Sequence, residues 1–315
     1  DIIMAISLAL KRYFHFQQGE YVTLNTGRPR TFIRLGGKTL LLLLVSAAVY
    51  GFVVRYLNGE PEVMMSEIEP VFVSQCLAAA TATAKPLDID GRLRVGVWNI
   101  YKQQKAGWQT DLSKMTQRSD LLLLQEAKLN DKLSQYLTQG GLHLVMAKAF
   151  SLLKSPVGVM NLSTEQAHDA CAYHAIEPWI RFAKSTLMSH YRLSNGQTLL
   201  VVNLHGINFD WQLKSFRGQW QQIVRKVSSH HGPVIIGGDF NTWRGQRMAY
   251  VDQLAHSLKL KEAVYEVDQR HRVFGLPLDH LYYRGLNLVA AESLNSQASD
   301  HNPIWAEFRL KPSVH

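Results

Sequence analysis

The sequence predicts an α/β protein in which two packed, mixed or mainly antiparallel sheets carry helices on their outer faces. From residue 93 onward, short β-rich runs alternate with amphipathic stretches of helical periodicity. Two of the runs, 185–190 and 198–203, are joined through Asn195-Gly196, which is the strongest short hairpin signal. A doubly wound parallel sheet needs a helix after nearly every strand, so the hairpin argues against that architecture. With 315 residues, 46% of them hydrophobic, the chain can bury a large core.

The most apolar stretch, residues 39–54, reads TLLLLLVSAAVYGFVV and lies between two cations. Sixteen residues are slightly fewer than the roughly 20 that cross a bilayer, but the flanking residues extend the stretch to 57. We therefore expect a transmembrane helix at 39–57, with a buried helix of a soluble protein as the alternative. Because residues 1–38 form a basic lead-in, the positive-inside rule predicts a cytoplasmic N-terminus and a C-terminal domain on the outer side.

Residues 58–91 are rich in proline, glycine and small residues and show weak apolar periodicity, so they predict a linker. Residues 1–60 hold seven Lys/Arg and three Asp/Glu, so +4 of the net charge of +9 lies there and +5 in the remainder. A solvated basic surface explains that remainder as well as a nucleic-acid footprint does. The two cysteines, Cys76 and Cys171, form no metal-binding or redox motif, and whether they pair stays open.

The main domain is expected at 92–310, followed by a short tail at 311–315. Its run at 120–125 is continuously apolar, which is typical of a fully buried strand, and Asn130 is placed to cap the helix after it. The remaining pattern predicts elements in this order: strand 93–99, helix 108–118, helix 130–137, strands 143–147, 157–162, 185–190 and 198–203, helix 211–230, a strand within 233–241, helix 248–260, and strands 278–283, 288–293 and 304–308.

Acidic, amide and imidazole motifs stand at, or just beyond, the ends of the apolar runs. They are Trp98-Asn99-Ile100, Gln125-Glu126, Asn203-Leu204-His205, Gly238-Asp239-Phe240-Asn241, Leu278-Asp279 and Ser299-Asp300-His301. Strand ends on a common edge of a sheet can gather distant residues into one pocket. Carboxylates, imidazoles and carboxamides together suit a hard divalent cation and a phosphate rather than a soft metal.

Phosphodiester cleavage needs a cation, donors for the phosphoryl oxygens and a base for water. Glu126, emerging from a buried strand, is a suitable Mg²⁺ ligand, although a helix-initiating glutamate is the plain alternative. Strand alternation places Asp239 and Asn241 on one side, where one supplies a base or ligand and the other a phosphate donor. Asp279 is expected to accept a hydrogen bond from His301 and hold it in one tautomer.

The order of these motifs resembles the endonuclease/exonuclease/phosphatase superfamily, over about residues 92–310. That family includes abasic-site endonucleases, DNase I-like nucleases, sphingomyelinases and inositol-polyphosphate phosphatases. The segments 97–104 and 298–303 resemble its YafD-like bacterial subgroup. The resemblance implies a four-layer sandwich with the site at one edge of both sheets. With the predicted anchor, it places the domain on the outer side of a bacterial inner membrane; the cytoplasm is the alternative.

The resemblance also implies a metal site. Asn99 and Glu126 would bind Mg²⁺ or Mn²⁺, Glu126 directly, while Asp300 would support both the metal and His301. Abasic-site endonucleases usually carry an acidic residue two positions after the Asn99 equivalent. Here that position is Tyr101, which argues against a dedicated DNA-repair role.

Four further roles follow from the same resemblance. His205 and Asn241 would contact the scissile phosphate, and Asp239 would position or deprotonate the water. Asp279 would orient His301. Spacing leaves open whether Asp239 or His301 is the base, because coupled groups share a proton.

Residues near the motif loops suggest how substrate is held. Arg270, Arg272, Arg244 and Arg247 are candidates for holding a polyanion, and Trp243 for stacking on a base, with a solvated rim as the alternative. We expect a divalent-metal-dependent phosphodiesterase, with a nuclease slightly favoured. The alternatives are a membrane-tethered phospholipid-headgroup phosphodiesterase, similar to sphingomyelinases, and a non-catalytic tethered binding module. No obligate protein partner is expected.

Overall fold

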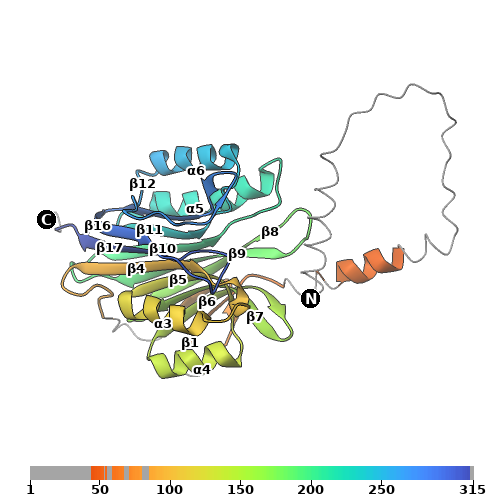
Figure 1. Cartoon of the computed structure of the whole chain (residues 1–315), viewed down its shortest axis with the longest axis horizontal. Helices are drawn as coiled ribbons and strands as arrows, with labels where there is room; N and C mark the ends of the chain where they lie inside the picture. The colour runs from red at the N-terminus through yellow and green to blue at the C-terminus, as the bar shows by residue number, and fades with distance from the viewer. Residues whose placement is uncertain (1–43, 53, 55–58, 67–70, 80–84, 313–315) are drawn as a thin grey trace. The chain divides into compact units, whose positions relative to one another are not determined.

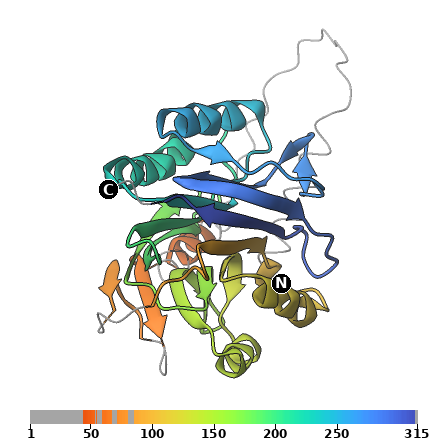
Figure 2. The same ribbon diagram turned by 90° about the vertical axis from the view of Figure 1, so that its left-hand side faces the viewer.

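The computed structural model describes residues 44–52, 54, 59–66, 71–79 and 85–312. From residue 59 onward, these residues form two large sheets packed face to face, with helices on the outer face of each (Figures 1 and 2). The prediction of two mixed sheets flanked by helices is therefore confirmed.

Each sheet is mixed, because the pairs β4–β5 and β10–β11 are parallel whereas the other pairs between the described strands of the two large sheets are antiparallel. The first sheet has the order β16 (Leu286–Ser293), β17 (Ile304–Leu310), β4 (Arg92–Asn99), β5 (Leu121–Lys128), β7 (Ser155–Ser163), β6 (His143–Leu152), β1 (Glu62–Ser66) and β2 (Val73–Ser74). The second has the order β12 (Lys261–Glu262), β15 (Asp279–Arg284), β11 (Val234–Asp239), β10 (Thr198–His205), β9 (Ala183–Arg192), β8 (Asp169–Ile176) and β3 (Cys76–Ala78).

Four helices and a small hairpin complete the body. The helices are α3 (Trp108–Arg118), α4 (Asp131–Gly140), α5 (Lys214–Ser229) and α6 (Gly245–Ser257), and the hairpin pairs β13 (Arg272–Val273) with β14 (Leu276–Pro277). A single 3₁₀ turn, η1 (Tyr101–Gln103), follows β4. Helices α3 and α4 pack on the first sheet, and α5 and α6 pack on the second (Figure 1).

Strand β5 begins with a continuous apolar run because both of its faces are buried. Alternation directs Leu121 and Leu123 into the core between the sheets, while Leu122 and Leu124 face the helices α3 and α4. A strand buried on both faces cannot alternate apolar with polar residues. The two central parallel pairs are thereby buried on both faces up to the edge where they end.

The expected linker is the clearest correction to the predicted domain boundaries. Within 58–91 the structure has β1, which pairs with β6, and β3, which pairs with β8, so this segment belongs to both sheets. Val63 faces the core between the sheets and Met64 packs in the helix-covered core. Because both faces of β1 are buried, its sequence, EVMMS, does not alternate between apolar and polar residues. A five-residue segment without this alternation does not predict a strand.

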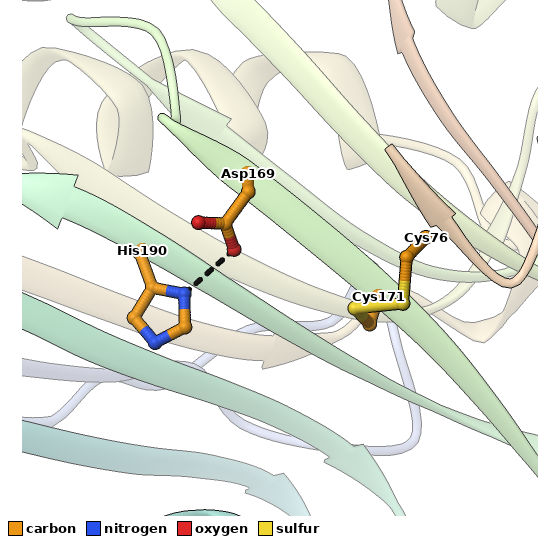
Figure 3. Close-up of a disulfide and its surroundings, with 4 residues drawn as sticks. All are labelled: Cys76, Asp169, Cys171 and His190. Carbon is orange, nitrogen blue, oxygen red and sulfur yellow. Dashed lines mark hydrogen bonds and ion pairs between the residues drawn. A yellow bond between two sulfur atoms is a disulfide. The ribbon is translucent and has the colours of Figure 1, made fainter. Parts of the chain in front are cut away.

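Cys76 and Cys171 form a disulfide between directly opposed residues of β3 and β8 (Figure 3). Their Cα atoms are 4.1 Å apart although 95 positions separate them in sequence. The bond ties the N-terminal strands to the edge of the second sheet. Sequence spacing left this pairing open, because neither cysteine stands in a recognisable motif.

Residues 44–52 and 54 are helical. Among the residues that the structure describes, no helix is both long and apolar enough to span a membrane. The predicted span at 39–57 extends over residues 39–43, 53 and 55–57, which lie outside the described residues, as does the lead-in at 1–38. The transmembrane helix therefore remains a prediction.

Every strand and helix predicted beyond residue 92 is present, with ends displaced by a few residues. Strand β8 was missed. Its sequence, DACAYHAI, is rich in alanine, and Ala170 and Ala172 are fully buried in the core. Alanine has low β-propensity, so this strand is fixed by pairing with β9 and by the small space available rather than by local preference.

Candidate active site

The polar motifs converge on one edge of the two packed sheets. Strand β4 ends at Asn99 and β10 at His205, while β11 ends at Asp239, which lies opposite Asp279 in the register of β11 with β15. The predicted gathering of strand ends is therefore what the structure has. Because the strands come from both sheets, the site lies across the interface between them.

Asp239 is at the centre of the site and is almost fully buried. Its Oδ2 accepts a hydrogen bond from Asn99 Nδ2 at 3.1 Å, and its Oδ1 accepts one from the backbone nitrogen of Asn241 at 3.0 Å. Gly238 precedes it at φ +149°, where a Cβ atom would lie only 1.9 Å from Leu204 O. Glycine is required here because β10 and β11 approach too closely for any side chain.

His301 and Asp279 form a hydrogen-bonded pair beside Asp239. His301 Nδ1 lies 2.7 Å from Asp279 Oδ2, and His301 Nε2 lies 3.9 Å from Asp239 Oδ2. The loop that carries His301 is tied to the end of β4, since Ser299 Oγ donates to Asn99 O at 2.6 Å and Trp98 Nε1 donates to His301 O at 3.1 Å. The expected partnership of Asp279 with His301 is therefore present in the structure.

Glu126 projects from a β-bulge in β5. The register of β5 with β7 shifts between Leu124 and Ala127, and Glu126 adopts φ +53°. Bulges of this kind redirect a side chain at the edge of a sheet. Glu126 forms an ion pair with Lys102, and its Oε1 lies 3.6 Å from His205 Nε2, which in turn lies 3.6 Å from Asp239 Oδ2.

Burial sets the charge states of the central pair. Desolvation and the nearby Asp279 carboxylate raise the pKa of Asp239 to about 6, although the positive charge of His301 opposes this rise. Burial by itself would lower the pKa of His301, but Asp279 and Asp239 outweigh it and raise that pKa to about 10. At neutral pH Asp239 is ionised and His301 is an imidazolium.

The second pair is shifted in the opposite sense. Burial would raise the pKa of Glu126, but Lys102, His205 and Lys184 lower it far below the ordinary value, so this carboxyl stays ionised. Burial and the cation Lys184, whose Nζ lies 2.5 Å from His205 Nε2, lower the pKa of His205 well below its ordinary value. His205 is therefore a neutral imidazole.

These residues fit a hard divalent ion. Among the described residues, Asp239, Asp279 and His301 are the set whose ligand atoms already converge, all within 4.8 Å of one another. Asp279 Oδ1 is buried without a hydrogen-bond partner among them, as expected for an oxygen that faces an ion or water. Because His301 Nδ1 is engaged with Asp279 and Mg²⁺ prefers oxygen, carboxylates such as Glu126 are the better direct ligands. Asp300 is exposed, with its carboxylate 3.4 Å from Ser299 Oγ, and its charge is among those that raise the pKa of His301.

Two of the arginines that were expected to bind substrate form ion pairs within the protein. The Arg270 side chain is only 8% exposed, because it donates to Glu262 and Asp268 and to the backbone oxygen of Asp279. Arg272 pairs with Asp268 at 2.6 Å and donates to Gly275 O, which closes the β13–β14 hairpin. Arg270 is therefore held within the fold, whereas the Arg272 side chain is 42% exposed and keeps part of its guanidinium open to solvent.

Arg247 is also structural, whereas Trp243 and Arg244 lie in the loop that follows Asn241 and contact the loop after β10. Arg247 is fully buried and donates to four backbone oxygens. Trp243 is half-buried, donates through Nε1 to Asn208 Oδ1 at 2.8 Å, and meets the Trp211 ring edge-on. Arg244 stands over the Trp211 ring and donates to Trp211 O.

Two lysines of the site were not found from the sequence. Lys102 lies in η1, only three residues after Asn99, and a cation so close to a motif residue was the available signal. Lys184 stands at the start of β9 and had no signal, since only antiparallel pairing with β10 brings it to His205.

The arrangement of carboxylates, imidazoles and lysines across two stacked sheets defines a hydrolytic site for phosphate esters. The family model of the Endonuclease/Exonuclease/phosphatase family matches residues 96–301, and the chain belongs to this family. Its members are hydrolytic phosphoesterases, among them phosphatases and nucleases, and they generally use divalent metals.

The chain is also similar to individual proteins. A UPF0294 protein of Vibrio vulnificus is 40% identical over 273 residues, which cover 86% of this chain and 96% of that protein. The structure of ANGEL2, described as a 2′,3′-cyclic phosphatase, matches with a TM-score of 0.57 at 15% identity and covers 70% of this chain and 95% of that one. TDP2 of D. rerio, complexed with a single-strand DNA product, matches with a TM-score of 0.51 at 16% identity, over 70% of this chain and all of that chain. At these identities the two structures establish a shared fold.

Proposed function

We propose that the protein is a divalent-metal-dependent phosphodiesterase, with nucleic acid as the favoured substrate class. One observation carries the proposal: Asp239, with a pKa raised to about 6, is held between Asn99 and the Asp279–His301 pair. A carboxylate near neutrality beside a fixed imidazolium is the combination that acid–base hydrolysis requires.

Each residue of the site has its own proposed role in the reaction. Asp239 takes a proton from the attacking water, because it is ionised at neutral pH whereas His301 already holds its proton. Asp279 keeps the His301 ring in place, and the charged ring stabilises negative charge that develops on the phosphoryl group. The neutral His205 and the amide of Asn241 are proposed to bind phosphoryl oxygens.

Glu126 and Asn99 would hold a divalent ion, Mg²⁺ or Mn²⁺, which would supply neutralisation of the phosphoryl charge. Lys102 and Lys184 already stand beside the Glu126–His205 pair and add positive charge where a phosphate would enter. These two ammonium groups attract an anionic substrate to this side of the site, and electrostatic attraction of this kind raises its local concentration.

The preference for nucleic acid has two supports. ANGEL2 and TDP2 share the fold; ANGEL2 is a 2′,3′-cyclic phosphatase, and the structure of TDP2 contains a single-strand DNA product. A Trp211–Trp243 pair at the rim offers aromatic surface of the kind that stacks on bases. A phospholipid headgroup is the second candidate, because Phe274 is 86% exposed at the tip of the β13–β14 hairpin.

We also propose that the domain works outside the cytoplasm, anchored to a bacterial inner membrane through residues 39–57. The Cys76–Cys171 disulfide supports this location, because such bonds persist in oxidising compartments and are rare in the cytosol. An exported enzyme would meet extracellular nucleic acid rather than the genome. Fusion of alkaline phosphatase to the C-terminus tests it: an active fusion supports export, and an inactive, stable fusion contradicts it.

The activity is tested with the purified full chain, first with Mg²⁺ and then with EDTA. The substrates are plasmid DNA, RNA, phospholipid vesicles and bis(p-nitrophenyl) phosphate. Asp239→Ala and His301→Ala should each lower metal-dependent turnover by at least about 100-fold if both groups act in proton transfer. Absence of turnover on all substrates, together with absence of Mn²⁺ binding by calorimetry, would leave only a tethered binding module.

A further inference from the structure

Two loops that leave the catalytic strands meet at a pair of tryptophans. One loop follows His205 at the end of β10 and carries Trp211, and the other follows Asp239 at the end of β11 and carries Trp243. The two rings meet edge-on with centroids 5.3 Å apart. Trp243 lies two positions after Asn241, so the aromatic pair is close in sequence to a residue of the proposed catalytic site.

The loops are held rigidly by a buried arginine. Arg247, fully buried in α6, donates to the backbone oxygens of Ile207, Asn208 and Asp210 in the first loop and of Asn241 in the second. Glu177 accepts from the backbone nitrogens of Asn208 and Phe209 at 2.6 and 2.9 Å. Such extensive hydrogen bonding fixes the position of exposed Trp211 before any ligand arrives.

Beyond Trp211 lies a groove of about 350 Å³ between the starts of α5 and α6. Its walls include two aromatic rings, one cation and three carboxamides: Trp211, Tyr250, Arg217, Gln212, Gln246 and Gln253. Arg217 stands over the Tyr250 ring at 5.3 Å, and Arg244 over the Trp211 ring at 5.6 Å. The groove therefore combines flat apolar surface with hydrogen-bonding amides and guanidinium groups.

We propose that this groove is a base-binding subsite for a single-stranded nucleic acid whose adjacent phosphate lies in the catalytic site. One base stacks on Trp211, and Arg217 or Arg244 pairs with a phosphate next to it. The inference rests on the proposed phosphodiesterase function and adds the substrate class and the residues that select it.

The composition of the groove favours a base over a lipid. A glutamine amide carries donors and an acceptor, so it pairs with the edge of any base, whereas acyl chains offer nothing to three such groups. An interfacial lipid site would pair aromatic residues with aliphatic ones, but around the groove only Leu213 and Ala249 are aliphatic, and Leu213 is buried. The size is at the lower end for ligand pockets and suits one base better than a folded structure.

The test compares two substrates that share the scissile chemistry but differ in bases. The kcat/KM of the full chain is measured on a single-stranded oligonucleotide and on bis(p-nitrophenyl) phosphate, and the ratio of the two is the readout. Trp211→Ala should lower this ratio at least about 5-fold, as expected for the loss of one stacked base, and Trp211→Phe should restore most of it. Arg217→Ala should lower it as well, while Arg225→Ala, an exposed arginine two turns later on α5, should not.

A second arm identifies the ligand as a base. An oligonucleotide with one abasic position, moved along the strand, should be cut more slowly by the wild type when the gap falls in the subsite. Trp211→Ala should not sense the gap, because the two deletions remove the same contact. Sphingomyelin and phosphatidylcholine vesicles form the third arm.

The outcomes separate the two levels of the proposal. Turnover of bis(p-nitrophenyl) phosphate with an unchanged ratio in Trp211→Ala would leave the phosphodiesterase function standing and overturn the subsite. A selective loss of vesicle hydrolysis in Trp211→Ala would overturn it in favour of a lipid. Absence of turnover of every substrate by the wild type would instead contradict the proposed function.

Discussion

Lys102 forms an ion pair with Glu126, the carboxylate proposed as the direct metal ligand. The turn that brings it there is unusual, since Tyr101, Lys102 and Gln103 all have φ near +50° to +55°. Three consecutive non-glycine residues in the left-handed region are costly, and such strain concentrates at functional sites. The ammonium therefore lies where a divalent ion would bind, and the two cations compete for one carboxylate.

Replacing Lys102 should strengthen metal binding. In Lys102→Met, Mn²⁺ no longer has to displace an ammonium group from Glu126, and the repulsion between the two cations is lost. We therefore expect the Kd for Mn²⁺, measured by calorimetry, to be at least about 5-fold lower. Lys132→Met, which removes an exposed lysine of α4, is the control and should bind Mn²⁺ as the wild type does. An unchanged or weaker affinity in Lys102→Met would show that Glu126 is not the ligand.

The rate should depend on pH through Asp239 and His301. Asp239 acts when ionised, so kcat/KM should fall tenfold per unit as the pH drops below about 6, where this carboxyl gains a proton. His301 acts when protonated, so the rate should also fall above about pH 10. The measurement is a pH–rate profile on bis(p-nitrophenyl) phosphate, expected to be bell-shaped with a broad plateau.

The upper limb of that profile has its own test. Asp279 raises the pKa of His301 through its charge and hydrogen bond, so Asp279→Asn should move the upper limb toward lower pH. An upper limb that stays at the wild-type position in Asp279→Asn would contradict the assignment of His301 as the acidic partner.

Local periodicity predicted most of the strands and helices of the main domain. It did not predict short strands that are buried on both faces or strands that consist of small residues. The apolar run that ends at Gln125 predicted β5, because a strand buried on both faces has apolar residues at consecutive positions. Strand β1 was read as part of a tether, because Val63 and Met64 point to two different cores and leave no alternation. Its place is set by pairing with β6, whose residues lie 78 to 86 positions further along the chain and leave no local pattern in β1.

The site was predicted better than its surroundings. Asp239, Asp279 and His301 stand at strand ends, and the order of strands brings ends together, so position alone located them. Arg270 was misplaced for the opposite reason, because a cation in a loop pairs with whichever carboxylate the fold places beside it. For Arg270 these were Asp268 and Glu262, and nothing in the sequence around it distinguishes this from an exposed substrate contact.

Arg247 should be essential for the stability of both catalytic loops. Arg247→Met keeps the volume but leaves four buried carbonyl groups without donors, so we expect a loss of about 3–5 kcal/mol in the free energy of unfolding. Urea denaturation followed by tryptophan fluorescence measures it. Arg244→Met, at a half-buried arginine that donates to Trp211 O, is the matched control and should change the unfolding free energy by less than about 1 kcal/mol.

The disulfide between Cys76 and Cys171 should stabilise the domain and report where it folds. It closes a loop of 95 residues, so the double variant Cys76→Ser, Cys171→Ser should lose about 2–5 kcal/mol, seen as a Tm lower by about 5–15 °C in calorimetry. Treatment of the wild type with dithiothreitol should give the same shift, whereas the double variant should not respond to it.

The same bond connects stability with location. A thiol-blocking assay on cells, with acid quenching before lysis, should find no free thiol in the full chain if the domain lies in an oxidising compartment. Two blocked thiols in rapidly quenched cells would place the domain in a reducing environment and contradict export, whatever the stability of the isolated protein. Because Cys76 and Cys171 are the only cysteines of the sequence, the assay has no background from other positions.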